Sequence, residues 1–536
     1  MSVVPSGHPA AAWSEAARLV GRWLDRRERI DELMERLPRN LTGIERARCQ
    51  HLVFGVVRHE GRLNAALGRL VPRPPRLILR AILYVAGYEL LEAGLHPDGP
   101  AGGEAVDSGL VAKVVHHAVE RAKTLASPAE ARLVNAVVRR LAGALAAQTV
   151  PPRLASAGAL AEYFSHPEWL VGRWLAQFGA EATRALLEWN QQPAPVYARW
   201  RAAEPTPAWL VPIRWPGFFE VVSGHWAEVE PLLASGQLYL QDPSARLAIE
   251  LLAPQAGETV LDLCAAPGGK SLQIADALAA AAEVTKLRPP DPVEPEGARR
   301  KRQLSPELEA GSPVAVVDDR RNDSVGQVSD LAYNDDGGHR PPLQNTVRAQ
   351  SDSTGTGPRP ASEQPEQTSL VTSAATGRVV AVDLPGERLP RLRENLARVR
   401  GVEAVLVEAD VAGPLAAALA ARRLPAEYAA VLIDVPCSNT GVMRHRVDVK
   451  WRLQEGDFAR HARQQLALLG AAARCVAPGG RLIYSTCSLD PEENEHVVAA
   501  FLRKYGEHFT LEAQALGRPW ETGCDGTGAF RLRRKA

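Results

Sequence analysis

The sequence predicts a multidomain protein in which an all-α domain precedes a larger α/β domain. Three observations support this: a length of 536 residues, helical periodicity in the first 150 residues, and alternating strand-like and helix-like segments after residue 239. A chain of this length exceeds the usual size of a single domain. Its 46% hydrophobic and 23% charged residues are typical of soluble globular proteins, which argues against fibrous, membrane-embedded and fully disordered classes.

Residues 1–150 carry the helical pattern. Apolar residues recur every three or four positions in four segments, which places them on one face of amphipathic helices: 16–27, 46–70, 76–91 and 130–145. This region holds 21 Lys and Arg against 15 Asp and Glu, although the net charge of the whole chain is only +1. The local basic excess, mostly arginine, suits phosphate contacts with RNA. The alternative is that these arginines simply lie on solvent-exposed helix faces, and this explains their number equally well.

A change of pattern divides the rest of the chain. Residues 151–238 combine a tryptophan-bearing amphipathic segment with short strand-like runs, which predicts a small α+β connector. Residues 239–536 alternate strands with helices, as parallel sheets do, and such sheets bind ligands at the carboxyl ends of their strands. The expected strands are 259–265, 378–383, 404–410, 428–436 and 481–487.

One segment, residues 285–376, interrupts this alternation. Its 92 residues include 27 Pro, Gly or Ser and a single aromatic residue, Tyr333. Such a composition buries too little apolar surface to offset the entropy of ordering the chain. We therefore expect a disordered insertion in a surface loop of the α/β domain.

Polar and glycine residues gather at the expected strand ends. The glycine-rich sequence DLCAAPGGK (262–270) follows the first strand of the α/β domain and opens a helix. Its glycines let backbone amides approach a ligand at a helix start that favours anionic groups. Asp383 and Asp410 end the next two strands, where carboxylates can accept hydrogen bonds from a ribose and from an adenine amino group. Together these features predict a nucleoside pocket.

Two cysteines, Cys437 and Cys487, follow the fourth and fifth strands and should lie over the same cleft. A reactive thiolate needs partial exposure and an electropositive neighbour, for which Lys270 is a candidate. The six cysteines of the chain form no CxxC pair. We therefore predict reduced thiols, with neither a metal site nor a disulfide framework.

Three segments carry a specific resemblance: DLCAAPGGK, DVPCSNTGV (434–442) and YSTCSLDPEENE (484–495). They resemble the hallmark motifs of the RsmB/NOP family of RNA 5-methylcytosine methyltransferases, and residues 241–252 resemble the stretch before the first motif. The helical domain resembles the NusB fold, with residues 134–140 matching its closing helix. This architecture is similar to the RsmB (Sun) type, which modifies cytosine 967 of 16S rRNA. The resemblance implies a Rossmann-like class I methyltransferase domain that uses S-adenosylmethionine.

The resemblance also implies roles for individual residues. Cys487 would be the nucleophile, Cys437 would assist release, and Asp434 would contact both the base and the methyl donor. The cofactor would be held by residues of the first motif and by strand-end carboxylates: Cys264, Ala265, Ala266, Pro267, Gly268, Gly269, Lys270, Asp383, Asp410 and Asp434. Val435 and Asn439 stand where the family usually has Ala and Gly. Asn tolerates a positive φ better than most residues if position 439 needs one.

Several alternatives remain open at this point. The same chemistry could act on tRNA or another RNA, or the chain could be a non-catalytic RNA-binding transcription or assembly factor. DNA methylation is disfavoured because DNA enzymes use the cysteine after proline, here Cys437, and amino-group methylation because its Asn/Asp-Pro-Pro-Tyr signature is absent. Without a signal-peptide pattern or a long apolar run, we expect a cytoplasmic protein that does not enter membranes. We also expect a monomer that binds small-subunit rRNA.

Overall fold

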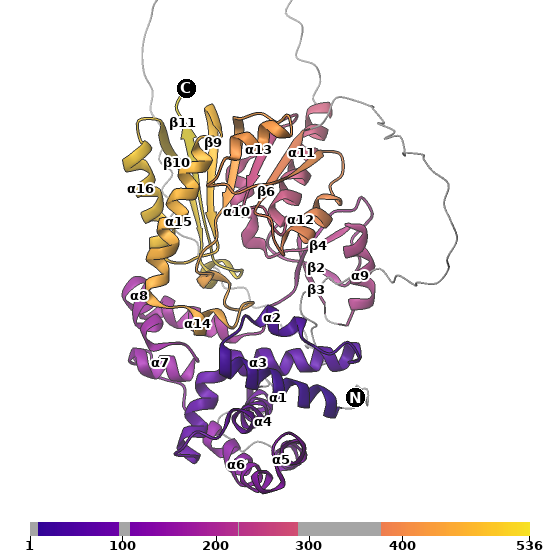
Figure 1. Cartoon of the computed structure of the whole chain (residues 1–536), viewed down its shortest axis with the longest axis vertical. Coiled ribbons are helices and arrows are strands. Elements are labelled where there is room, and N and C mark those ends of the chain that lie inside the picture. Colours follow the sequence, from indigo (N-terminus) through magenta and orange to yellow (C-terminus); the bar gives the residue numbers. More distant parts are fainter. Residues whose placement is uncertain (1–8, 96–107, 223, 288–376) are drawn as a thin grey trace, which may run out of the picture.

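The computed structural model describes residues 9–95, 108–222, 224–287 and 377–536. A helical domain lies at one end of the molecule and a seven-stranded sheet covered by helices lies at the other, with a small sheet at the side (Figure 1). Within these ranges, no helix is both long and apolar enough to cross a membrane.

The amino-terminal domain is helical, as predicted. Its helices are α1 (Pro9–Arg26), α2 (Ile30–Glu35), α3 (Gly43–Leu70), α4 (Leu77–Leu95), α5 (Ser108–Leu125) and α6 (Pro128–Ala146). Thr42 and Glu45 form a capping box that starts α3, which satisfies otherwise unpaired backbone amides. Trp23 and Tyr84 are almost fully buried in the shared core. The four periodic segments lie in α1, α3, α4 and α6, whereas α2 and α5 were not anticipated individually.

Residues 151–238 contain both helices and strands, in agreement with the predicted mixture. The elements of this region are α7 (Ala157–Tyr163), α8 (Glu168–Gln191), β1 (Tyr197–Trp200), β2 (Leu210–Pro212), β3 (Phe218–Val221) and α9 (Trp226–Ser235). With β4 (Leu238–Leu240), the strands form an antiparallel sheet in the order β2-β3-β1-β4. Strand β4 then leads directly into the α/β domain.

The large sheet has the order β10-β11-β9-β8-β5-β6-β7. Its strands are β5 (Thr259–Leu263), β6 (Arg378–Asp383), β7 (Glu403–Glu408), β8 (Tyr428–Asp434), β9 (Val476–Thr486), β10 (Phe509–Gly517) and β11 (Thr527–Arg534). The five predicted strands, β5 to β9, are parallel, whereas β11 runs antiparallel between β9 and β10. The β10–β11 hairpin was not predicted. The strand order reverses at β5, a position that favours a ligand crevice.

Helices cover both faces of this sheet, so its central strands are buried. One face packs against α10 (Arg246–Leu252) and α11 (Gly269–Leu287), and α12 (Leu389–Leu396) packs near β6. The other face packs against α13 (Leu415–Ala421), α15 (Glu455–Ala473) and α16 (Glu495–Tyr505). Of the predicted insertion, residues 285–287 belong to α11, and the remainder lies outside the described residues.

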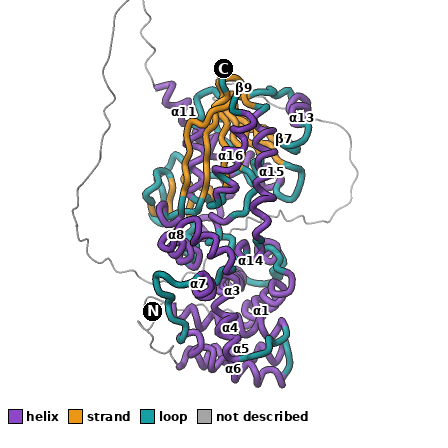
Figure 2. The backbone as a smooth tube through the Cα atoms, turned by 90° about the vertical axis from the view of Figure 1, so that its left-hand side faces the viewer, coloured by secondary structure: helices purple, strands orange, loops and turns teal. Residues whose placement is uncertain are grey.

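A short segment after β8 joins the domains. It contains α14 (Val449–Arg452), which lies between α3 and the large sheet (Figure 2). The Lys450 ammonium donates to the Arg58 carbonyl at 2.8 Å, and the Trp451 indole donates to the Val57 carbonyl, also at 2.8 Å. Val447 belongs to the core of the helical domain, while Met443 packs with α7 and α8. The chain that follows the Cys437 loop is therefore fixed by the helical domain.

Candidate active site

The predicted glycine-rich loop makes a tight turn between β5 and α11. Gly268 has a φ of +104°, and a Cβ there would lie 3.0 Å from Leu392 and 3.1 Å from Asn395. Only glycine combines this conformation with this close approach. The Asn395 side chain also donates to the Pro267 carbonyl at 2.7 Å. The loop is thus held against α12 and leaves its other side open.

A cavity of about 240 Å³ lies on that open side, at the carboxyl end of β5. Its lining includes seven predicted residues: Cys264, Ala265, Ala266, Pro267, Gly269, Lys270 and Asp434. It also includes four residues that were not among the predicted contacts: Tyr239, Leu240, Gln241 and Asp262. Gln241 and Asp262 are the first residues of two segments that carried the resemblance, and Leu240 directly precedes Gln241. The positions of those segments could therefore have identified all three residues. Three predicted contacts, Gly268, Asp383 and Asp410, do not line the cavity.

Asp383 and Asp410 make local hydrogen bonds instead. Asp383 accepts from the amide of Ala266 and from the amide of Leu384, both at 2.8 Å. Asp410 is exposed and accepts from the amide of Ala412 at 2.9 Å. In this structure the Asp383 carboxylate therefore fastens the glycine-rich loop to β6.

Asp262 is a buried acid next to this cavity. It is fully buried, and its Oδ2 accepts a hydrogen bond from the Ser271 hydroxyl at 2.5 Å. Burial raises the pKa of Asp262 to about 7, and the Ser271 hydrogen bond opposes this rise. Among the described residues, its Oδ1 has no hydrogen-bond partner. The cavity therefore has an acceptor available for a donor group of a ligand.

Lys270 pairs with Asp434 across the cavity, with an Nζ–Oδ2 distance of 2.7 Å. Burial alone would lower the pKa of the Lys270 ammonium, but the charge and hydrogen bond of Asp434 outweigh it and raise the pKa. The Lys270 charge also acts on Cys487, as anticipated. Its direct partner, however, is the carboxylate rather than a thiol.

The two predicted cysteines lie together. The Sγ atoms of Cys437 and Cys487 are 3.1 Å apart, with Cys437 buried and Cys487 partly exposed. The hydrogen bond between them lowers the pKa of the Cys487 thiol and raises that of Cys437. The positive charges of Arg446 and Lys270 lower the pKa of Cys487 further, whereas burial and Asp434 oppose the shift. These effects favour Cys487 over Cys437 as the thiolate of the pair.

Asn439 shapes the loop behind Cys437. Its φ of +62° lies in the left-handed region, so the position does require a positive φ, which Asn tolerates. The side-chain amide nitrogen of Asn439 donates to the Cys437 carbonyl at 2.8 Å, and the Asn439 Oδ1 lies 3.3 Å from the Cys487 sulfur. Val435 is buried in the core of the large sheet. The fold therefore accommodates Asn439 and Val435, the two residues that depart from the family pattern.

A network of buried polar side chains holds the two loops that carry the thiols. The Glu493 carboxylate accepts from the Ser438 amide at 2.9 Å and from Gln465 at 3.1 Å. Asp490 accepts from the Thr440 hydroxyl at 2.6 Å and from Arg173 of α8 at 3.0 Å. These supporting residues were not predicted individually, although all but two of them lie in the two cysteine motifs. The network ties the loop of one cysteine to the loop of the other.

Gly441 allows these loops to approach each other. A Cβ there would lie 2.6 Å from the Gly526 carbonyl oxygen and 2.7 Å from that of Cys487. Gly441→Ala is therefore expected to push the loops apart, to lower the free energy of unfolding by about 1–3 kcal/mol, and to reduce activity strongly. Urea unfolding and a methyl-transfer assay measure both effects. A Cβ at Gly456 meets no atom within 4 Å, so Gly456→Ala is the matched control, and an equal loss in both variants would contradict the prediction.

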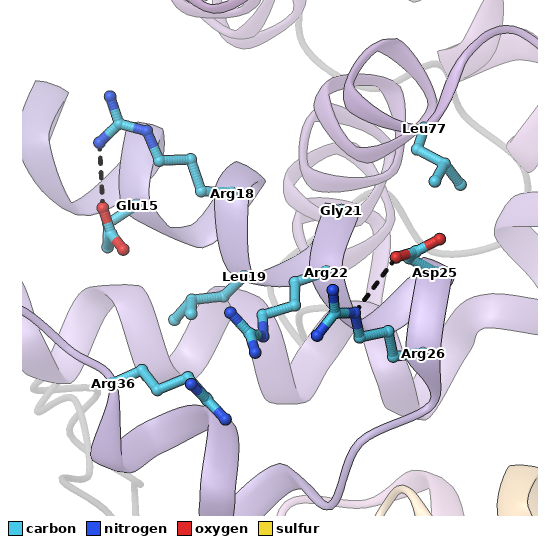
Figure 3. Close-up of a pocket in the computed structure, with 9 residues that line it drawn as sticks. All are labelled: Glu15, Arg18, Leu19, Gly21, Arg22, Asp25, Arg26, Arg36 and Leu77. Carbon is cyan, nitrogen blue, oxygen red and sulfur yellow. Dashed lines mark hydrogen bonds and ion pairs between the residues drawn. The ribbon is translucent and has the colours of Figure 1, made fainter.

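A larger cavity of about 500 Å³ lies elsewhere, in the helical domain (Figure 3). Four arginines line it: Arg18, Arg22, Arg26 and Arg36. They form ion pairs at 2.9–3.5 Å with three carboxylates, those of Glu15, Asp25 and Glu28. Because these acids offset most of the positive charge, the cavity is a weak candidate for an anion site. The chemistry is concentrated at the strand ends of the large sheet.

Comparisons with known proteins agree with this location. Residues 366–522, which include both thiols and Asp434, match the family model of 16S rRNA methyltransferase RsmB/F. The chain is 26% identical over 519 residues to ribosomal RNA small subunit methyltransferase B of Sodalis glossinidius, covering 94% of this chain and 92% of the relative. The protein of the same name from Citrobacter koseri is 24% identical over 513 residues, covering 92% and 90%.

The fold also has a solved counterpart. The crystal structure of PH0851 matches with a TM-score of 0.62 and 17% identity, covering 99% of this chain and 100% of that one. At this identity the likeness shows the fold alone. The family model over residues 366–522 and the relatives over nearly the whole length make this chain similar to the RsmB/F type of 16S rRNA methyltransferase.

Proposed function

We propose that this protein transfers a methyl group from S-adenosylmethionine to carbon 5 of a cytosine in 16S rRNA, at position 967. The transfer proceeds through a temporary bond between Cys487 and carbon 6 of the base. One observation carries the proposal: two thiols lie 3.1 Å apart at adjacent strand ends, beside an Asp434–Lys270 pair that borders the cofactor cavity.

The cavity suits the proposed cofactor. Its lining includes the Asp262 carboxyl group, whose Oδ1 has no partner among the described residues and would accept a hydrogen bond from the ammonium group of the cofactor. When bound, S-adenosylmethionine supplies an electrophilic methyl group. The backbone of residues 264–269 would lie along it. Asp383 would accept from the ribose hydroxyls and Asp410 from the adenine amino group.

The residues have complementary roles in the reaction. Carbon 5 of cytosine is a poor nucleophile until the Cys487 thiolate adds to carbon 6 and makes the ring an enamine. Asp434 near nitrogen 3 stabilises this adduct. After carbon 5 takes the methyl group, Cys437 helps its proton to leave. The electron pair of the carbon 5–hydrogen bond then re-forms the ring double bond, and Cys487 departs as a thiolate.

The substrate must present an exposed base. A cytosine inside a duplex cannot reach the two thiols, so the target must be unpaired or flipped out of its stack, as in RNA loops. The basic helical domain would bind the surrounding rRNA as a NusB-like unit, with residues 134–140 in its closing helix α6. A non-catalytic assembly factor would have an incomplete site, whereas Cys437, Cys487, Lys270 and Asp434 are brought together here.

Bisulfite sequencing tests the proposal. Deleting the gene from its host should remove one 5-methylcytosine from 16S rRNA, and expression of the intact chain should restore it. An unchanged 16S pattern would contradict the proposed substrate. Sequencing tRNA from the same cells would then test the alternative RNA class.

A further inference from the structure

Three side chains with metal-binding groups meet outside the lining of the cavity at the glycine-rich loop. Asp242 follows β4, His445 lies in the segment after β8, and Asp525 lies between α17 (Pro519–Thr522) and β11. Each offers one oxygen or nitrogen atom, and these three atoms lie within 4.8 Å of one another. No cysteine takes part in this cluster, so the spacing of the cysteines could not reveal it.

Asp525 carries an unsatisfied oxygen atom. Its side chain is only 6% exposed, and its Oδ1 has no hydrogen-bond partner among the described residues. A buried carboxylate oxygen without a partner costs free energy, because its lost hydration is not replaced. Since the carboxyl group of Asp525 faces the other two side chains of the cluster, a cation placed among them would compensate this loss.

The spacing of Asp525 and His445 suits a metal ion better than a direct bond. The Nε2 atom of His445 lies 3.5 Å from Oδ2 of Asp525, which is beyond the usual length of a hydrogen bond. In a tetrahedral zinc site, ligand atoms about 2.1 Å from the ion lie about 3.4 Å from each other. The His445 side chain is 29% exposed, so the cluster is open to an ion from solvent.

Hydrogen bonds orient the third side chain, Asp242. Its Oδ1 accepts from the Ser244 amide at 2.8 Å and from the Asp525 amide at 3.1 Å. Because both of these bonds within the described residues end on the same oxygen, Oδ2 can act as a ligand. Outer contacts of this kind fix the direction of a metal-binding carboxylate.

Arg444, the residue before His445, brings a positive charge close to the two acids. Its guanidinium donates to the Pro193 carbonyl at 2.7 and 3.0 Å and lies 4.0 Å from the centroid of the Trp189 ring. A guanidinium is too broad to lie among three atoms within 4.8 Å of one another. A single metal ion fits this space.

The cluster is connected to the two cysteine loops through the backbone. Asp525 precedes Gly526, whose amide donates to the Gly441 carbonyl at 2.8 Å. The Gly441 amide in turn donates to the Cys487 carbonyl at 3.0 Å. An ion bound to Asp525 would therefore hold the start of β11 against both loops.

We propose that Asp242, His445 and Asp525 bind one divalent transition-metal ion, for which Zn²⁺ is the best match. One imidazole nitrogen and two carboxylate oxygens suit Zn²⁺, and three protein ligands leave a fourth position for water. The role of the ion is structural, because it joins β4, the segment after β8 and the start of β11. This inference goes beyond the proposed methyl transfer and does not depend on it.

Calorimetric titration with Zn²⁺ alone gives the first test. The full-length protein is used without a histidine tag and after removal of metals by a chelator, and it carries Cys437→Ala and Cys487→Ala so that these thiols cannot bind zinc. One Zn²⁺ should bind per chain. His445→Ala and Asp525→Asn should each weaken binding at least about tenfold, since even the loss of an outer partner costs roughly 10–100-fold. His496 is exposed on α16, so His496→Ala is the control and should leave the affinity unchanged.

Absorption spectra with Co²⁺ in place of Zn²⁺ identify the ligands. Bound Co²⁺ should give visible d–d bands without the near-ultraviolet band of a cobalt–thiolate bond. A thiolate band, a lack of Zn²⁺ binding, or equal affinities in His445→Ala and the control would each overturn the proposal. Zn²⁺ should also raise the Tm of the protein by a few degrees and leave that of His445→Ala unchanged. If Asp525→Asn does not fold, the partly exposed His445 still decides the outcome through His445→Ala.

Discussion

Cys487→Ala is expected to abolish methyl transfer to RNA while leaving cofactor binding nearly intact. The thiolate that activates the ring is lost, and Cys437 cannot replace it, because Cys437 is buried and burial still raises the pKa of its thiol in this variant. The cofactor cavity is lined by other residues and should keep its shape. Transfer of a radiolabelled methyl group measures activity, and calorimetry measures cofactor affinity.

The same strand supplies a matched control for this variant. Cys475 is a buried cysteine directly before β9, at the opposite end of the strand from Cys487. Cys475→Ala should cost some stability through lost packing and retain activity. Substantial turnover by Cys487→Ala would end the assignment of Cys487 as the nucleophile.

Cys437→Ala is expected to accumulate a covalent protein–RNA species. Cys487 can still add to carbon 6 in this variant, but the step that removes the carbon 5 proton and releases the product loses its assisting group. The adduct should appear as a slow band on a denaturing gel when RNA and S-adenosylmethionine are both present. The double variant Cys437→Ala/Cys487→Ala should lack the band, and its absence from the single variant would count against the release role.

The pH dependence of adduct formation provides an independent check on the cysteine pair. The Cys437 hydrogen bond is the main cause of the lowered pKa of the Cys487 thiol. Removing that donor should raise the pKa, so a smaller fraction of Cys487 is thiolate at neutral pH. Two pH profiles are compared: adduct formation in Cys437→Ala, and alkylation of Cys487 by iodoacetamide in the wild type. The profile of the variant should rise at higher pH than that of the wild type. An unshifted profile would mean that the two sulfurs do not share a proton.

Local patterns in the sequence determined the helical domain, the five parallel strands and the placement of both cysteines at strand ends. Apolar periodicity reports which face of an element is buried, and it needs no knowledge of distant partners. The β10–β11 hairpin was missed because an edge hairpin of this sheet is defined by its antiparallel pairing with β9, which no local pattern encodes. The left-handed turn at Asn439 was within reach of the sequence, because few residue types tolerate it.

Only the tertiary structure decided which side chains meet. Asp383 accepts a hydrogen bond from the glycine-rich loop, and Lys270 bonds Asp434 rather than a thiol. Asp31 meets Arg446 across more than 400 positions of sequence. Such contacts depend on how whole helices and strands pack, and each polar group takes the nearest partner that offsets its loss of water. The sequence thus determined which chemical groups reach the site, and packing determined how those groups are paired.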